Sequence, residues 1–134
     1  MAHKYVLDTH ALVWYLEGNP RLGQDAKTVM DDPHSEMILP IIALAEAAYI
    51  IERGRTSIPD VQSLLKAVLA DPRLEIYPLN WEVFQQTLTA TAVPEMHDRQ
   101  IVATAIHLRT LGHTASVLTK DNTIVAAGLV PITW

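Results

Sequence analysis

Cysteine is absent from the 134 residues of this chain. Its absence excludes disulfides, thiolate zinc sites, iron–sulfur clusters and cysteine nucleophiles, and it suits a reducing cytosol. Long hydrophobic runs are also scarce. The longest extends over residues 37–51, which is too short to span a bilayer, and it contains Pro40 and Glu46. At the N-terminus, Asp8 and His10 interrupt any signal-like apolar segment. We therefore expect a soluble cytoplasmic protein without membrane contact.

Basic residues are a minority: 10 Lys and Arg stand against 15 Asp and Glu, for a formal net charge of −5. Nonspecific nucleic-acid binding relies on basic surface, so the charge alone argues against it. That objection weakens if several carboxylates converge on divalent cations, because the metal reverses the local sign. The charge therefore leaves nucleic-acid binding open.

The chain has the size of one domain, without repeats or a dividing linker, so we expect a single domain over residues 1–134. Short runs rich in β-formers alternate with helical patterns. The alternation predicts an α/β fold: a three-layer sandwich with a central, mainly parallel sheet of four to five strands flanked by helices. The expected strands are 4–7, 36–39, 74–77, 115–118 and 130–132, and the expected helices are 10–17, 24–30, 41–53, 60–70, 81–91 and 99–111.

Two acidic residues lie early in this pattern. Asp8 ends the first expected strand, where it is either a helix N-cap or a metal ligand at the mouth of the sheet. Glu46 lies in a helical segment whose neighbours at three and four positions include Ile42, Tyr49 and Ile50. A carboxylate in apolar surroundings is costly unless a cation or strong hydrogen bonds compensate, so Glu46 favours a functional interpretation over a solvated face.

Two further acids follow later segments. Asp98 opens the last long helical pattern, where an N-cap is a strong alternative to a ligand. Asp121 comes just after a strand, within Thr119-Lys120-Asp121-Asn122, where it could be only a turn. An open parallel sheet can bring all four acids to its carboxyl edge. Clustered carboxylates select hard cations such as Mg²⁺ or Mn²⁺, and that chemistry points to phosphodiester cleavage by metal-activated water.

Four segments of the chain resemble, in order and spacing, the motifs of PIN-domain ribonucleases, and specifically the VapC toxins of type II toxin–antitoxin systems. These segments are Val6-Leu7-Asp8-Thr9-His10-Ala11-Leu12, Leu44-Ala45-Glu46, residues 97–105 beginning His97-Asp98-Arg99, and Leu118-Thr119-Lys120-Asp121. The ending, residues 128–134, is similar too. The resemblance extends over essentially the whole chain.

The resemblance implies a PIN-like fold and a Mg²⁺-dependent endoribonuclease, with Mn²⁺ as a possible substitute. Asp8, Glu46, Asp98 and Asp121 would hold the metal, and Thr119, with Thr9 as a further candidate, would place a hydroxyl beside it. Such enzymes cut RNA by in-line attack of water, leaving a 5′-phosphate. The implied partners are the RNA substrate, a cognate antitoxin and a second copy of the chain in a homodimer.

Two alternatives stay open. A receiver-like signalling domain would use Asp8, Thr119 and Lys120 around a phosphorylation site, but receivers want paired acids after the first strand and another acid after the third. A PIN fold without activity would act only as a binding module, and the four acids count against it. The six histidines show no ligand-like pairing, which favours solvated or capping roles.

Overall fold

A computed structural model describes residues 3–134 of the chain. Its elements are, in order, β1 (His3–Leu7), α1 (Thr9–Glu17), α2 (Gln24–Asp31), β2 (Glu36–Pro40), α3 (Ile41–Glu52), α4 (Val61–Ala70), β3 (Leu74–Tyr77), α5 (Trp81–Thr87), α6 (Met96–Thr110), β4 (Thr114–Leu118), α7 (Asn122–Ala127) and β5 (Ile132–Thr133). The alternation confirms the predicted α/β class.

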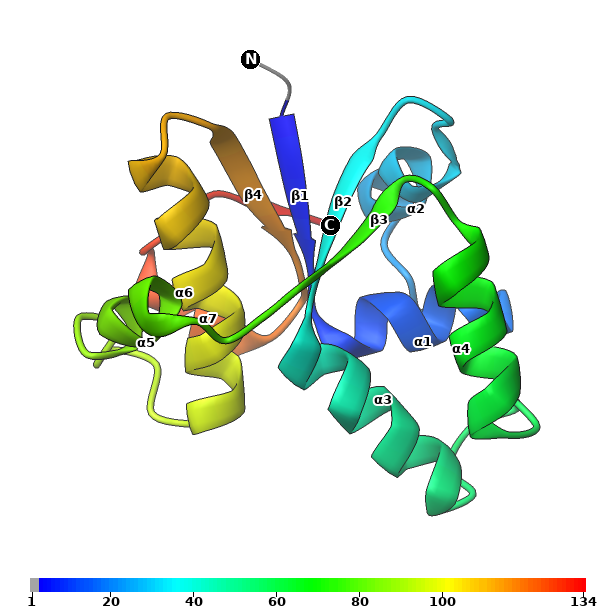
Figure 1. Cartoon of the computed structure of the whole chain (residues 1–134). Coiled ribbons are helices and arrows are strands. Elements are labelled where there is room, and N and C mark those ends of the chain that lie inside the picture. The colour runs from blue at the N-terminus through cyan, green and yellow to red at the C-terminus, as the bar shows by residue number, and fades with distance from the viewer. Residues whose placement is uncertain (1–2) are drawn as a thin grey trace.

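The five strands form one parallel sheet in the order β3-β2-β1-β4-β5. From β1 the chain first moves outward to β2 and β3, and then returns to the other side of β1 to add β4 and β5. Because parallel connections are right-handed, this reversal places the intervening helices on opposite faces of the sheet. Figure 1 shows α1 to α4 on one side and α5 to α7 on the other, which gives the three expected layers.

The central strands are buried on both faces, so they read as continuous apolar runs rather than alternating ones. Val6, Leu7, Val117 and Leu118 have no exposed surface, and β2 contributes Met37 to Leu39 to the same core. Within residues 3–134, no helix is long and apolar enough to cross a lipid bilayer.

The largest differences from the sequence expectation lie in three helices. Helix α6 begins at Met96 rather than Arg99, because the Glu95 side chain caps it by accepting from the Asp98 backbone N–H. Helix α5 ends at Thr87, four residues early. Helix α7 was not among the expected helices; the side chain of Asp121 caps its start and Gly128 ends it at φ 62°.

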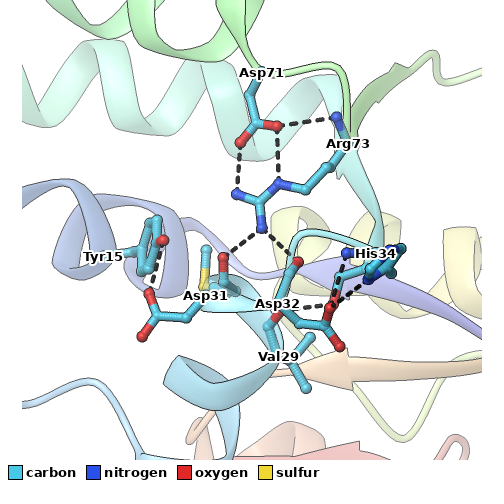
Figure 2. Close-up of polar contacts among 9 residues, drawn as sticks. Tyr15, Val29, Asp31, Asp32, His34, Asp71 and Arg73 are labelled. Atoms are coloured by element: carbon cyan, nitrogen blue, oxygen red, sulfur yellow. Dashed lines mark hydrogen bonds and ion pairs between the residues drawn. The ribbon is translucent and has the colours of Figure 1, made fainter.

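At the amino end of the sheet, Arg73 joins three segments of the chain (Figure 2). Its Nη1 donates to the carbonyl oxygens of Met30 and Asp32, both at 2.7 Å, at the end of α2 and just after it. Nε and Nη2 donate to the two carboxylate oxygens of Asp71 at 3.0 and 2.9 Å. The Arg73 carbonyl accepts from the N–H of Met37 in β2. The guanidinium therefore fixes the start of β3 against the end of α2, and the backbone carbonyl joins it to β2.

We predict that Arg73→Ala lowers the free energy of unfolding by roughly 1.5–3 kcal/mol, because hydrogen bonds to a charged group are lost and two carbonyls lose their donor. Urea denaturation monitored by circular dichroism measures the change. Arg55→Ala, at an exposed arginine, is the matched control and should stay within about 0.5 kcal/mol of wild type. Equal stability of the two variants would show that the Arg73 network contributes nothing.

Candidate active site

The carboxyl ends of β1 and β4 meet at the centre of the sheet, and Asp8 and Thr119 lie just beyond them. The two strands pair with Leu7 opposite Leu118, so the next residue of each strand is a neighbour. The Thr119 hydroxyl donates to Asp8 Oδ2 at 2.6 Å, and the pair is buried, with Thr119 1% exposed. Asp8 Oδ1 accepts from the Thr9 N–H at 2.7 Å.

Asp8 therefore acts as the N-cap of α1 while its side chain also lines a pocket at the sheet edge. The N-cap interpretation is confirmed, and the metal-ligand interpretation stays a prediction, since capping leaves the side chain at the pocket. Burial raises the pKa of Asp8 above its ordinary value, against the hydrogen bonds from Thr119 and Thr9 that lower it. A carboxylate held on both oxygens in this way has one orientation.

Asp121 is tied to the same hydroxyl. Its N–H donates to Thr119 Oγ1 at 3.0 Å, while its Oδ1 accepts from the N–H groups of Thr123 and Ile124 at 2.9 and 3.0 Å. Thr119 thus accepts from one acidic residue's backbone and donates to the other's side chain. It does not itself line the main pocket, so it acts there by positioning Asp8 and Asp121.

Glu46 reaches the pocket from α3. Its Oε1 accepts from the Thr9 hydroxyl at 3.1 Å, and its Oε2 lies 3.3 Å from His97 Nδ1. The side chain is 33% exposed, so it is not enclosed by apolar neighbours as its sequence context suggested. Ile42, Tyr49 and Ile50 instead line the same pocket beside it.

Asp98 lies in the first turn of α6, and the N-cap interpretation of this residue is wrong, because Glu95 is the cap. Its carboxylate is therefore free to face the pocket. Burial, followed by repulsion from Asp121, Asp8, Glu95 and Glu46, raises the pKa of Asp98 to about 7. A carboxyl in this state has like charges on several sides and no cation to balance them.

Together, the four acids predicted from the sequence line one pocket of about 570 Å³ at the carboxyl edge of the sheet. They come from four separate elements: the ends of β1 and β4, the middle of α3 and the start of α6 (Figure 1). The edge lies at the point where the strand order reverses, which is where open α/β sheets bind ligands.

The donors fit a hard divalent cation in kind. All four are carboxylates, and oxygen ligands are those that Mg²⁺ and Mn²⁺ prefer. Within residues 3–134, no three acidic or imidazole groups are close enough together to form a closed ligand set. Mg²⁺ does not require one, because it keeps several waters and binds through one or two carboxylates. After burial, repulsion from the other acids contributes to the raised pKa of Asp98, and a bound cation would offset that repulsion.

Two histidines that the sequence favoured as solvated or capping groups also line the pocket: His10 and His97. His97 Nδ1 lies 3.4 Å from Glu95 Oε1 as well as near Glu46. The only sequence signal for either was adjacency, since His97 precedes Asp98 and His10 follows Thr9. Arg99 does not orient Asp98; its Nε donates to the carbonyl of Val93.

Comparisons with known proteins bear on the family and the fold of this chain. The family model for the PIN domain matches residues 5–128. A chain in the crystal structure of VapBC2 from Rickettsia felis bound to a DNA fragment from their promoter superimposes with a TM-score of 0.69, at 16% identity over 96% of both chains. A chain in FitAcB from Neisseria gonorrhoeae gives 0.65 at 18% identity, over 96% of this chain and 95% of that one. No curated protein sequence matches this chain.

We predict a pH-dependent stability that depends on Asp98. Its pKa is about 7 in the folded chain and near the ordinary 3.8 when unfolded, so the folded state holds the extra proton between these values. In chelator, this contribution to stability is therefore full below about pH 4 and lost as the pH rises through 7. Asp98→Asn should remove the slope and be more stable than wild type above pH 7.

Urea denaturation from pH 4 to pH 8 measures this. Asp25→Asn, at an exposed aspartate of α2, should keep the wild-type slope. Parallel curves for wild type and Asp98→Asn across that window would contradict the raised pKa.

Proposed function

We propose that this chain, which belongs to the PIN domain family, is a metal-dependent endoribonuclease and the toxin of a type II toxin–antitoxin pair. The observation that carries the proposal is the convergence of four carboxylates from four elements on one pocket. The likeness to chains of VapBC2 and FitAcB supports the toxin role. We take residues 1–134 as one PIN-like domain, with residues 1–2 outside the described part.

In this proposal Asp8, Glu46, Asp98 and Asp121 hold Mg²⁺, for which Mn²⁺ can substitute. The bound cation would neutralise phosphate charge and lower the pKa of a water that attacks the phosphodiester. The chain's own residues fix the ligands: Thr119 orients Asp8, and the Thr9 hydroxyl orients Glu46. Thr119 is a positioning residue, since its hydroxyl donates its hydrogen bond to Asp8.

A bound cation would also reduce the repulsion between the acidic pocket and the phosphates of an RNA substrate. The chain is net acidic, and its pocket concentrates that charge, so phosphate would be repelled without metal. A bound divalent cation would offset part of this negative charge and would place a positive charge where the phosphate binds. We propose RNA as the substrate, a cognate antitoxin as the inhibitor, and a homodimer as the assembly.

The strand order of the sheet excludes one of the two alternatives. Receiver domains have the strand order 2-1-3-4-5, whereas this sheet has β1 at its centre in the order 3-2-1-4-5, so the receiver interpretation is wrong. A PIN fold that only binds a partner has the same fold as an active one. Cleavage of structured RNA in Mn²⁺, abolished by chelator, tests which of the two this chain is.

We predict that Glu46→Gln lowers RNA cleavage roughly 100-fold or more, because it removes one of the four carboxylates proposed to hold the cation that stabilises the reacting phosphate. Metal-free stability should stay level or rise, since the variant relieves repulsion on Asp98 while Gln can still accept from Thr9. A gel assay in Mn²⁺ and urea denaturation in chelator measure the two effects. Glu52→Gln, at an exposed position near the end of the same helix, is the control and should cleave as wild type does. A Glu46→Gln protein that unfolds more easily yet still cuts RNA would falsify the role.

Mg²⁺ should raise thermal stability, because a ligand that binds only the folded state stabilises it by mass action. The stabilisation is about 1.4 kcal/mol at ten times the dissociation constant. Differential scanning calorimetry from zero to 10 mM Mg²⁺ measures it. Glu52→Gln should show the full shift and Asp98→Asn a reduced one. Identical melting temperatures with and without Mg²⁺ would count against a metal site.

A further inference from the structure

A second, smaller pocket of about 310 Å³ adjoins the carboxylate pocket. Both pockets are lined by Asp8, His10 and Asp121, so they meet at these residues. The smaller one continues away from the acids between α1 and the segment after β4. Its volume lies at the lower end for ligand sites, which begin at about 300 Å³. It therefore suits one small unit of a larger substrate.

Aromatic rings line this smaller pocket. Trp14 of α1 is 9% exposed, and its ring centroid lies 5.9 Å from that of Trp134 in an edge-to-face arrangement. The His10 ring lies 5.2 Å from Trp14 on the other side. Successive bases of single-stranded nucleic acid stack on such side chains, and the stacking tolerates any base because every base has a π-face.

Trp134 is held in place by contacts outside the pocket. Its carbonyl oxygen accepts from the Asp25 N–H at 3.2 Å, at the start of α2. Its backbone and ring also press on Gly23, where an added Cβ would lie 2.5 Å from the Trp134 carbonyl oxygen. Only glycine leaves room for that approach. The aromatic wall is thus formed before any ligand arrives.

A basic side chain also lies at the smaller pocket. Lys120 Nζ lies 4.8 Å from the Trp14 ring centroid, and its side chain is exposed. The residue stands between Thr119 and Asp121 in the chain, so its position is fixed by the same segment that supplies the acids. In a protein of net charge −5, an ammonium beside two carboxylates is the local group that attracts a phosphate rather than repelling it.

We infer that the smaller pocket binds one nucleotide of the RNA next to the scissile phosphate, with its base on Trp134, which packs on the largely buried Trp14, and its phosphate on Lys120. The inference rests on the proposed ribonuclease function, which places the scissile phosphate at the acids that both pockets share. A single strand running past those acids enters the smaller pocket on one side. The pocket then contributes affinity and a base preference at one position beside the cut.

Two measurements test the inference: binding of a short single-stranded RNA with a non-hydrolysable backbone in Mg²⁺ by fluorescence anisotropy, and cleavage of a randomised RNA pool in Mn²⁺ with sequencing of the products. Trp134→Ala and Lys120→Ala should each weaken binding about tenfold, within the range expected for a lost stacked base. In cleavage, KM should rise by a similar factor with little change in kcat, and base preference should relax at one flanking position only.

For each substitution in the pocket, a control removes the same type of residue at a position outside the pocket. Trp81→Ala removes a 65% exposed tryptophan of α5, and Lys66→Ala removes an exposed lysine of α4. Both should bind and cut RNA as wild type does. Trp134→Phe keeps an aromatic ring and should restore most of the binding lost in Trp134→Ala. If Trp134→Ala does not fold, Lys120→Ala and Trp134→Phe carry the test.

The outcomes separate the inference from the function on which it rests. A wild-type enzyme that cuts RNA, with pocket variants that match it in KM and base preference, overturns the inference alone. Binding in Mg²⁺ that depends on the pocket, without cleavage in Mn²⁺, supports the pocket and contradicts the ribonuclease. Wild type that neither binds nor cuts RNA overturns both. Pocket variants that change only self-association would make the surface a protein contact, which also overturns the inference.

Discussion

The parallel pairing of β1 with β4 determines where every acidic group of the site can lie. The last residues of the two strands are paired directly, and the buried hydrogen bond from Thr119 to Asp8 continues this pairing beyond the strand ends. Asp121 follows two residues later and is tied to the same hydroxyl. Glu46 and Asp98 then approach from helices on opposite faces of the sheet. A shift of β4 by one residue would reverse its inward and outward side chains and separate the group.

The site combines structural and electrostatic demands in the same residues. Asp8 and Asp121 cap helices, which stabilises the fold, while their charges repel Asp98. Asp98 has no capping duty, because Glu95 performs it. Protonation of Asp98 therefore disturbs no helix start.

The two ends of the sheet differ in how their charges are balanced. At the amino end, the Arg73 guanidinium meets its partners with matched charges and satisfied carbonyls, so this end is suited to stability. At the carboxyl end, like charges face one another across a pocket that opens to solvent. The unbalanced charge at this edge is tolerable because the pocket opens to solvent, while the buried apolar strands beneath it stabilise the fold.

The sequence alone determined the α/β alternation, the parallel sheet and the set of four acids, because each depends on local periodicity and on residues that follow strand ends. It did not determine the start of α6 or the existence of α7. An aspartate such as Asp98 or Asp121 can be a helix cap or a turn residue, and the residues next to it in the chain do not distinguish the two. Nor did it show that Glu46 faces a pocket with His97 beside it. The contacts that complete both pockets join residues far apart in the chain: Thr119 to Asp8, and Trp134 to Trp14. Only tertiary structure decides these, because they depend on which strands lie side by side and on where a glycine leaves space for a ring.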